Sequence, residues 1–92
     1  MPKVVLEGYI LVSDSDLPSV EKELPNHIRL TREEEGCLAF DVLQDVVNAN
    51  RFSVYEEFSS RSSFEYHQQR VHSSNWGRLS RDVERHYQIT EA

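Results

Sequence analysis

Cysteine is almost absent from this 92-residue sequence, in which Cys37 is the single one. One thiol excludes an internal disulfide framework and a zinc site built from several cysteines. Neither a histidine nor a basic residue stands beside Cys37, and a reactive thiolate normally has such a neighbour. We therefore expect Cys37 to be a small apolar residue of a strand rather than a nucleophile.

Basic residues are fewer than acidic residues, and the sequence contains no long apolar run. Ten Lys and Arg stand against 16 Asp and Glu, and the resulting net charge of −6 argues against a nucleic-acid or anionic-membrane partner. No stretch approaches the roughly 20 apolar residues of a membrane span. Glu7 interrupts the N-terminal apolar run, so that run does not resemble a signal peptide. These features predict a cytoplasmic protein with neither nucleic acid nor a membrane as its partner.

The three glycines are isolated from one another, at Gly8, Gly36 and Gly77. A phosphate or a dinucleotide is usually bound by a loop in which glycines are clustered, so no such loop is predicted. The Gly-x-Ser-x-Gly motif of serine hydrolases is missing as well, and a catalytic triad has no support. We expect no bound cofactor.

The length predicts a single domain over residues 1–92, near the size at which one core is only marginally sufficient. Segments rich in β-branched and aromatic residues predict strands over residues 3–13, 37–45, 51–58 and 83–89. Asparagines between the second and third of these segments suit a hairpin turn.

A first helix is predicted between the first two strands. Its apolar residues recur at three- and four-residue steps, and Asp14 or Asp16 would cap its N-terminus. Pro25 should kink or restart this helix, because proline lacks the amide donor and its ring crowds the preceding turn. Gly36 would end the helix in a left-handed conformation.

A second helix is predicted over residues 59–71, with Ser59 or Ser60 as its cap, and residues 73–82 form a short helix or an irregular link. The order is then strand, helix, strand, strand, helix, strand. This order predicts an α+β, ferredoxin-like βαββαβ fold, in which both helices lie on one face of a four-stranded antiparallel sheet.

The first two strands are apolar on both faces. In the second strand the residues that alternate are Leu38, Phe40 and Val42 on one face and Cys37, Ala39 and Leu43 on the other. In the first strand they are Val4, Leu6 and Ile10 on one face and Val5, Tyr9 and Leu11 on the other. Two helices can cover only one face of the sheet, so the other face needs a partner. We predict a homodimer in which two sheets pack face to face.

The second helix carries a histidine on its inner face. The residues that follow the spacing of a core-facing stripe are Phe64, His67, Gln68 and Val71. His72 lies about 140° further round the helix, so the two histidines make a poor metal pair and no metal site is predicted. From this spacing, His67 is either a buried histidine satisfied by one hydrogen bond or a group that faces a site.

The third strand places a carboxylate among apolar side chains. The residues that share one face are Phe52, Val54, Glu56 and Phe58, whereas Glu57 points the other way, to solvent or to a dimer edge. A buried carboxylate needs a partner or a raised pKa, and an inward histidine supplies a partner. Such a pair suits a general base. The alternative is that Glu56 pairs structurally with an arginine or with Tyr55.

Four aromatic residues surround this pair in the predicted fold: Phe40, Phe58, Phe64 and Trp76. Each can serve simply as a core residue. Together they can also wall a cavity for a flat organic ligand.

Three stretches resemble the antibiotic biosynthesis monooxygenase superfamily, and its quinol monooxygenases in particular: "EEEGCLAFDVLQD", "RFSVYEEF" and "SSFEYHQQRVH". The matching elements are Glu35-Gly36-Cys37, Glu56, Phe58, Phe64, His67 and His72. Phe58 stands where the family often has tryptophan. The resemblance runs through nearly the whole chain, and it implies a dimeric α+β barrel with a pocket between sheet and helices in each subunit.

Several members of that superfamily oxygenate quinols or polycyclic phenols with molecular oxygen and use neither metal nor flavin. The resemblance therefore implies a cofactor-independent monooxygenase with a small aromatic substrate. In it, His67 would take a phenolic proton and Glu56 would orient His67. The substrate pocket would comprise Phe40, Tyr55, Phe58, Phe64, His72 and Trp76.

Other branches of the superfamily provide alternatives. The sequence is also similar to phospho-autoinducer isomerases in "FDVLQD" and "RFSVYEEF". Their small phosphorylated carbonyl substrate would need cations in the pocket, such as Arg70 or Arg78. Haem degradation is not expected, because the first strand has no asparagine and Gly77 lies near the position of the haem ligand. A non-catalytic module that binds a small ligand also stays open.

Overall fold

The structure, a computed structural model, describes residues 2–91. In chain order its elements are β1 (Val4–Leu11), α1 (Leu17–Arg32), β2 (Cys37–Gln44), β3 (Arg51–Phe58), α2 (Arg61–His72), α3 (Asn75–Leu79) and β4 (Glu84–Glu91). The four strands and the two long helices occur in the predicted order. The segment that links α2 to β4 contains the short helix α3.

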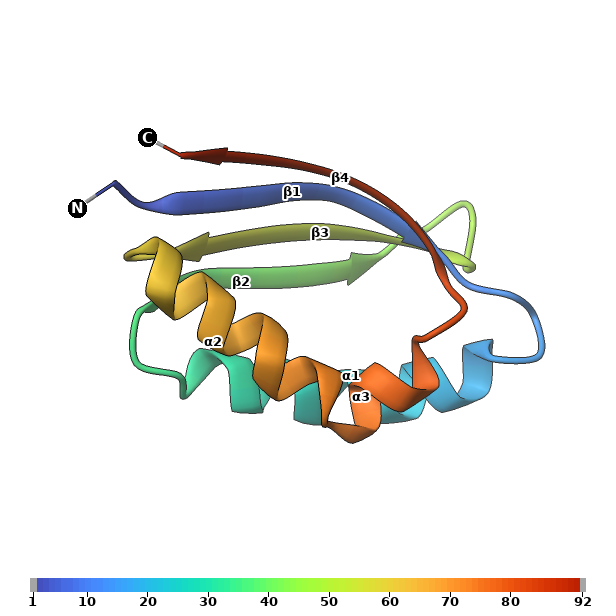
Figure 1. The fold of residues 1–92 in the computed structure, drawn as a ribbon. Helices are drawn as coiled ribbons and strands as arrows, with labels where there is room; N and C mark the ends of the chain where they lie inside the picture. Colours follow the sequence, from blue (N-terminus) through green and yellow to red (C-terminus); the bar gives the residue numbers. More distant parts are fainter. Residues whose placement is uncertain (1, 92) are drawn as a thin grey trace.

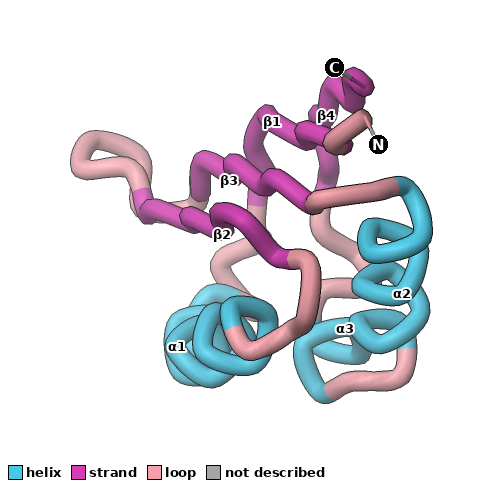
Figure 2. Tube along the Cα trace, turned by 90° about the vertical axis from the view of Figure 1, so that its left-hand side faces the viewer, coloured by secondary structure: helices cyan, strands magenta, loops and turns pink. Residues whose placement is uncertain are grey.

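The four strands form one antiparallel sheet in the order β2-β3-β1-β4. All three helices lie on the same face of this sheet (Figure 1), and the view turned by 90° separates the layer of strands from the layer of helices (Figure 2). This is the predicted α+β, ferredoxin-like βαββαβ arrangement. No helix among residues 2–91 is both long and apolar enough to cross a membrane.

α1 begins beside Asp16, one of the two predicted caps, although the Asp16 side chain makes no capping hydrogen bond. The helix runs through Pro25 as one element and ends at Arg32, so the prediction that it continues to Gly36 is wrong. Gly36 does have a positive φ of 92°, but in the turn that leads into β2. A Cβ added there would lie 2.3 Å from Oγ of Ser63.

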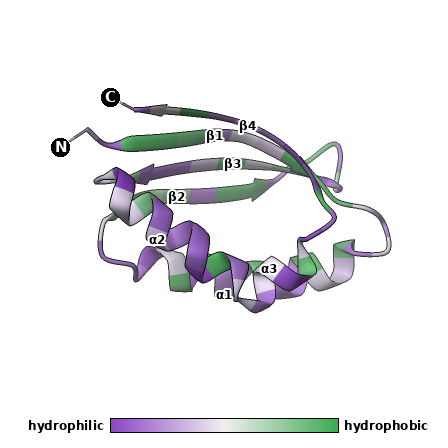
Figure 3. Ribbon diagram, in the orientation of Figure 1, coloured by the Kyte–Doolittle hydropathy of each residue, from purple (hydrophilic) through white to green (hydrophobic). Residues whose placement is uncertain are grey.

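α2 is capped by Ser60, whose hydroxyl accepts a hydrogen bond of 3.2 Å from the amide of Ser63. The helix is largely hydrophilic (Figure 3), and Phe64 and His67 are its buried residues. Only a narrow stripe of α2 therefore packs on the sheet, and one of the two buried residues in that stripe is polar.

A β-bulge at the start of β2 changes which side chains face the core. Cys37 lies opposite Phe58 and Ala39 lies opposite Glu57, which leaves Leu38 as the extra residue. Cys37 therefore packs against the core, while Leu38 is 57% exposed. Simple alternation along the sequence predicts the reverse for these two residues, and the bulge makes that prediction wrong.

The core lies between the sheet and the helices. As predicted, the inward residues of the two central strands are buried: Val4, Leu6, Ile10, Phe52, Val54, Glu56 and Phe58. On the outer face of β1, Val5, Tyr9 and Leu11 are half-buried although no helix covers them (Figure 1). The outer face thus presents apolar side chains on its central strand.

Gly8 lies at the centre of β1, opposite Val54 on β3 and Tyr87 on β4. A Cβ added at Gly8 would lie 1.8 Å from the carbonyl oxygen of His86, and the φ of Gly8 is +156°. Glycine at this position therefore allows the backbone of β4 to approach β1 closely.

We expect Gly8→Ala to lower the free energy of unfolding by about 2 kcal/mol. Either β4 must move away from β1, or the alanine must keep a backbone conformation that is strained for a residue with a side chain. Urea unfolding followed by far-UV circular dichroism measures this change. The control is Gln88→Ala, exposed on β4, which should change the free energy of unfolding by less than about 0.5 kcal/mol. Equal stability of Gly8→Ala and the wild type would contradict the close approach of the two strands.

Candidate active site

His67 lies on the inner face of α2 and is 2% exposed. Phe64, one turn earlier, is buried in the same stripe, and Val71, one turn later, packs at the edge of the core. Gln68 is exposed, so the stripe is narrower than the spacing of the sequence predicts. The histidine therefore occupies the centre of the contact between α2 and the sheet.

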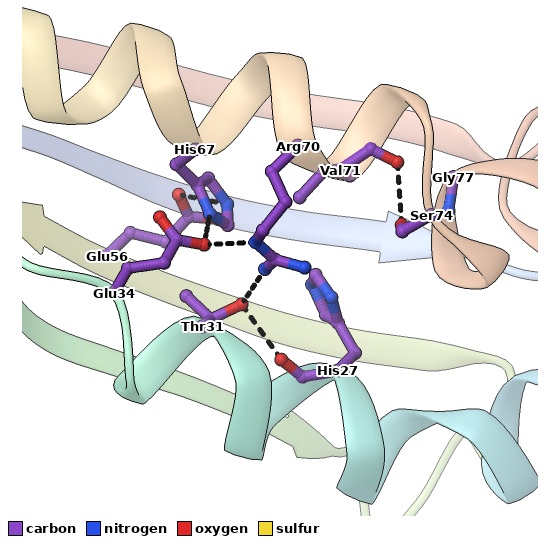
Figure 4. Close-up of polar contacts among 9 residues, drawn as sticks. All are labelled: His27, Thr31, Glu34, Glu56, His67, Arg70, Val71, Ser74 and Gly77. Carbon is purple, nitrogen blue, oxygen red and sulfur yellow. Dashed lines mark hydrogen bonds and ion pairs between the residues drawn. The ribbon is translucent and has the colours of Figure 1, made fainter.

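Glu34, in the turn between α1 and β2, fixes the orientation of His67. Its Oε2 atom lies 2.9 Å from Nδ1 of His67 and accepts a hydrogen bond of 2.7 Å from Nε of Arg70 (Figure 4). Because arginine only donates, this oxygen is an acceptor and Nδ1 of His67 carries the hydrogen. Nε2 of His67 is therefore left with a free lone pair. The Glu34 side chain is 4% exposed, so solvent hardly reaches this contact.

Arg70 extends the network to α1. Its Nη2 atom donates to Oγ1 of Thr31 at 2.9 Å, and the Thr31 hydroxyl donates to the carbonyl oxygen of His27 at 2.8 Å. Figure 4 shows this series of contacts crossing from α2 to α1. Buried and half-buried polar groups thus join the two helices.

Glu56 points inward from β3, and its Oε1 atom lies 3.8 Å from Nε2 of His67. Within residues 2–91 this buried oxygen has no hydrogen-bond partner. Burial, and to a smaller extent the Glu34 carboxylate, raise the pKa of Glu56 to about 8. At pH 7 Glu56 is therefore a neutral carboxylic acid.

The sequence predicts that Glu56 orients His67, but the structure gives that contact to Glu34. The distance from Glu34 to His67 is that of a hydrogen bond, whereas 3.8 Å from Glu56 exceeds it. Glu34 lies in a turn, where neither the helical nor the strand period indicates a direction. The only signal for it in the sequence is the acidic run over residues 33–35.

His67 and Glu56 form an uncharged base and acid side by side. Burial lowers the pKa of His67, and the hydrogen bond to Glu34 opposes this shift only in part. His67 is therefore a neutral imidazole near pH 7, with the lone pair of Nε2 beside the protonated carboxyl group. Such a pair can take a proton from one atom of a ligand and give a hydrogen bond to another.

His27 is a second buried imidazole near the first. It lies on α1, is 4% exposed, and stacks on Trp76 with ring centroids 4.6 Å apart and an interplanar angle of 4°. Burial lowers the pKa of His27 to about 3, so the ring is uncharged. His27 is not predicted as a site residue. Its spacing could have indicated it, because His27 follows Val20 by seven residues and precedes Thr31 by four, which places it on the buried face of α1.

A cleft of about 430 Å³ opens beside these groups, lined by residues of α2, α3 and β4. His27, Glu56 and His67 are among its buried lining residues, and Trp76 and Tyr87 add aromatic surface. Burial, and to a smaller extent Glu56, raise the pKa of Tyr87 to about 12, so its hydroxyl stays protonated at neutral pH. The cleft therefore combines a base, an acid and a phenol with aromatic walls.

Two of the predicted pocket residues, His72 and Trp76, line this cleft. Phe40, Phe58 and Phe64 do not, because they lie behind it in the core. The rings of Phe40 and Phe58 pack against the imidazole of His67, with centroid distances of 5.7 and 4.9 Å. Phe40 and Phe58 thus cover the imidazole on its core side.

Tyr55, which is also predicted as a pocket residue, lies outside the cleft. It lies on the outer face of β3, where its hydroxyl donates a hydrogen bond of 2.6 Å to Glu57. Glu57 also accepts from Lys3 at 3.0 Å, on the same outer face. Neighbouring residues of a strand point to opposite faces, so Tyr55 cannot share the side of Glu56.

Four other hollows among the described residues do not include His67, although one of them, a cavity of about 30 Å³, shares His27, Glu56 and Tyr87 with the cleft. A more open groove of about 650 Å³ lies between α1 and β2, over Leu24, Ile28 and Phe52. Its arginines, Arg29 and Arg32, pair with the surface carboxylates of neighbouring residues. Within residues 2–91, no group of three or more His, Cys, Asp or Glu side chains is arranged to hold a metal ion. The cleft at His67 is therefore the candidate active site.

Comparison with known proteins gives the family of the chain. The family profile described as antibiotic biosynthesis monooxygenase matches residues 4–79, which is most of the sequence. The chain belongs to the antibiotic biosynthesis monooxygenase family. The matched residues include Glu34, Glu56, His67 and Trp76, whereas Tyr87 lies beyond them. A search of curated proteins gives no match.

Solved structures share the fold of this chain. A conserved protein of unknown function from Bacteroides thetaiotaomicron, described as a possible oxidoreductase, has a TM-score of 0.81 at 16% identity, over 99% of this chain and 98% of that one. A candidate antibiotic biosynthesis monooxygenase from Nitrosomonas europaea has a TM-score of 0.76 at 20% identity, over 99% and 88%. Another, from Deinococcus radiodurans, has a TM-score of 0.69 at 19% identity, over 97% and 89%. Identities this low establish the fold alone.

The raised pKa of Glu56 makes the stability of this protein depend on pH. Between the ordinary value of 4.5 and about 8, the unfolded chain has lost a proton that the folded chain keeps, so stability falls as pH rises. We expect Glu56→Gln to gain stability relative to the wild type across this window, on the order of 1 kcal/mol per pH unit. Urea unfolding at several pH values within the window measures the difference.

Glu57→Gln is the matched control for this prediction. Hydrogen bonds from Tyr55 and Lys3 lower the pKa of Glu57, so its removal should give no gain in stability as pH rises. Parallel pH profiles for Glu56→Gln and the wild type would mean that Glu56 is ionised in the folded protein at neutral pH.

Proposed function

We propose that this member of the antibiotic biosynthesis monooxygenase family is a monooxygenase that works without a cofactor and oxidises a small quinol or polyphenol with molecular oxygen. The observation that carries the proposal is the state of Nε2 of His67. This atom has a free lone pair, lies beside the neutral acid Glu56, and belongs to a side chain that lines an aromatic cleft. A quinol has a hydroxyl group to deprotonate and a flat ring to stack, which suits both parts of the site.

In the proposed reaction, Nε2 of His67 takes a proton from one substrate hydroxyl, and Glu34 stabilises the imidazolium that forms. The neutral carboxyl group of Glu56 donates a hydrogen bond to a substrate oxygen. The substrate anion then supplies all the electrons that reduce oxygen. One quinol and one O₂ give one hydroxyquinone and one water, because one oxygen atom bonds to a ring carbon and the other leaves with two protons.

The surroundings of His67 support this chemistry. Phe40 and Phe58 pack against its ring, which keeps water away from the base and strengthens electrostatic interactions near it. The stacked rings of His27 and Trp76 give the cleft a flat wall. With a pKa of about 3, His27 adds aromatic surface and does not compete with His67 as a base.

Isomerisation of a small phosphorylated carbonyl compound is a second candidate. Enolisation needs a base that removes a proton from carbon and an acid that binds the carbonyl oxygen, and the neighbouring His67 and Glu56 provide both. Such a reaction consumes no oxygen. A non-catalytic module, the third candidate, would bind an aromatic ligand and leave it unchanged.

We expect oxygen uptake by metal-free protein with at least one member of a panel of quinols and polyphenols. His67→Ala should lower kcat about 100-fold or more, because the general base is lost. Glu34→Gln, a change in the positioning residue, should lower kcat about 10- to 100-fold and shift the pH profile of kcat, because Nδ1 of His67 loses its carboxylate partner. An oxygen electrode measures both.

The control for these variants is Gln69→Ala, exposed on the same helix, which should keep full activity. Unchanged uptake in His67→Ala would sink the assignment of the base. A wild-type protein that consumes no oxygen with any substrate would favour the isomerase or the binding module.

We also propose that two copies of the chain pair through the outer faces of their sheets. Val5, Tyr9 and Leu11 line this face on β1, and Leu43 on β2 is 66% exposed. The ring of Tyr9 is held flat between His86, at a centroid distance of 4.6 Å, and the guanidinium of Arg51, at 3.7 Å. Apolar and flat groups of this kind suit an interface between two sheets.

Light scattering at micromolar concentration should give twice the chain mass of 10.8 kDa. Leu43→Glu should shift the protein to the monomer, because the charge would be buried at the interface without a partner. Val46→Glu is the control, since Val46 lies on the hairpin between β2 and β3 and is 99% exposed. A monomeric wild type would rule out the pairing.

A further inference from the structure

The exposed rim of the His67 cleft is basic although the chain as a whole is acidic. His72, Arg81 and Arg85 all line the cleft, and all three are exposed. The net charge of the chain is −6, so a rim of this kind departs from the average surface. An anion that approaches the cleft therefore meets positive charge there.

These three side chains have no acidic partner in the part of the chain that the structure describes. Arg32, Arg61 and Arg70, by contrast, each pair with a carboxylate. Arg81 makes no side-chain hydrogen bond among residues 2–91. Arg85 donates to Ser80 and Val83, at 2.6 Å to the Ser80 carbonyl, and interacts with the hydroxyl of Tyr87. None of these partners is a carboxylate, so the charge of Arg85 stays unneutralised among the described residues.

The buried end of the same cleft is uncharged. His67 is a neutral imidazole and Glu56 a neutral acid, while Oε2 of Glu34 accepts hydrogen bonds from His67 and Arg70. Positive charge is thus confined to the exposed rim. A ligand that matches this charge distribution is neutral at the end that lies beside His67 and negatively charged at the end that lies at the rim.

We infer that the substrate carries an anionic substituent, a carboxylate or a phosphate, which Arg81 and Arg85 bind at the rim while the oxygen-bearing ring reaches His67. The inference rests on the proposed function for the identity of the reacting end. Guanidinium groups bind both anions through paired N–H donors. Because both arginines are exposed, the attraction is screened by salt.

Calorimetric titration in the absence of oxygen tests this inference with three probes: hydroquinone, 2,5-dihydroxybenzoate and 4-hydroxyphenyl phosphate. We expect the wild type to bind at least one anionic probe about tenfold or more tighter than hydroquinone. The better of the two anionic probes identifies the substituent as carboxylate or phosphate. The preference should shrink as the salt concentration rises.

Arg81→Gln and the double variant Arg81→Gln/Arg85→Gln should lose most of this preference and keep the affinity for hydroquinone. Arg81 makes no internal contact that folding would need, so the single variant tests the charge alone. Arg78→Gln is the matched control: it removes the same charge from α3, but Arg78 does not line the cleft, so the preference should survive.

Equal affinity for neutral and anionic probes, no binding of either anion at millimolar concentration, or a preference kept in the double variant would overturn the inference. Oxygen uptake with the same probes separates it from the proposed function. If the protein prefers the anionic probes but consumes no oxygen, the proposed monooxygenase activity is wrong and the anion site stands. If the protein consumes oxygen without preferring the anionic probes, the anion site is wrong and the proposed activity stands.

Discussion

One carboxylate oxygen, Oε2 of Glu34, determines most of what the site can do. It accepts hydrogen bonds from Nδ1 of His67 and Nε of Arg70, and both of these residues come from α2. Because Glu34 lies in the turn after α1, the same atom joins the two long helices and selects the tautomer of His67. Without this acceptor the lone pair of Nε2 would not be held toward Glu56, and the cleft would have no defined base.

The neutrality of His67 and Glu56 follows from the same arrangement. An ionised Glu56 would be buried and close to the Glu34 carboxylate. Burial, and to a smaller extent repulsion between the two carboxylates, therefore favour the protonated form of Glu56. The Glu34 carboxylate would stabilise a protonated His67, but burial disfavours this charged form more strongly. The two groups titrate as neighbours, and the pH range in which both are neutral is the range in which one can accept a proton and the other can donate a hydrogen bond. Lowering the pH below that range charges the base, and raising it charges the acid.

Periodicity predicts the parts of the site that lie on regular elements. The helical spacing of α2 places His67 inward, and the alternation of β3 places Glu56 beside it; the structure has both there. The role of Glu34 is not predicted in this way, because Glu34 lies in a turn and a turn has neither the helical nor the strand period. The face of the sheet on which Cys37 lies is predicted wrongly, because a bulge shifts the alternation by one residue at the start of β2. Tyr55 is different: the alternation that turns Glu56 inward already turns Tyr55 outward, so the strand period by itself places Tyr55 outside the cleft.

The docking of α2 and the assembly of the site depend on the same contacts. α2 is largely hydrophilic (Figure 3), and Phe64 is its one fully apolar buried residue. Burying a phenylalanine contributes about 1.5–3 kcal/mol, and a hydrogen bond to a charged group contributes about 1.5–3 kcal/mol net. The contacts of Glu34 with His67 and Arg70 are therefore comparable to the apolar packing that holds the helix on the sheet. A base on this helix is in place only while the helix is docked, so the forces that complete the fold also complete the site.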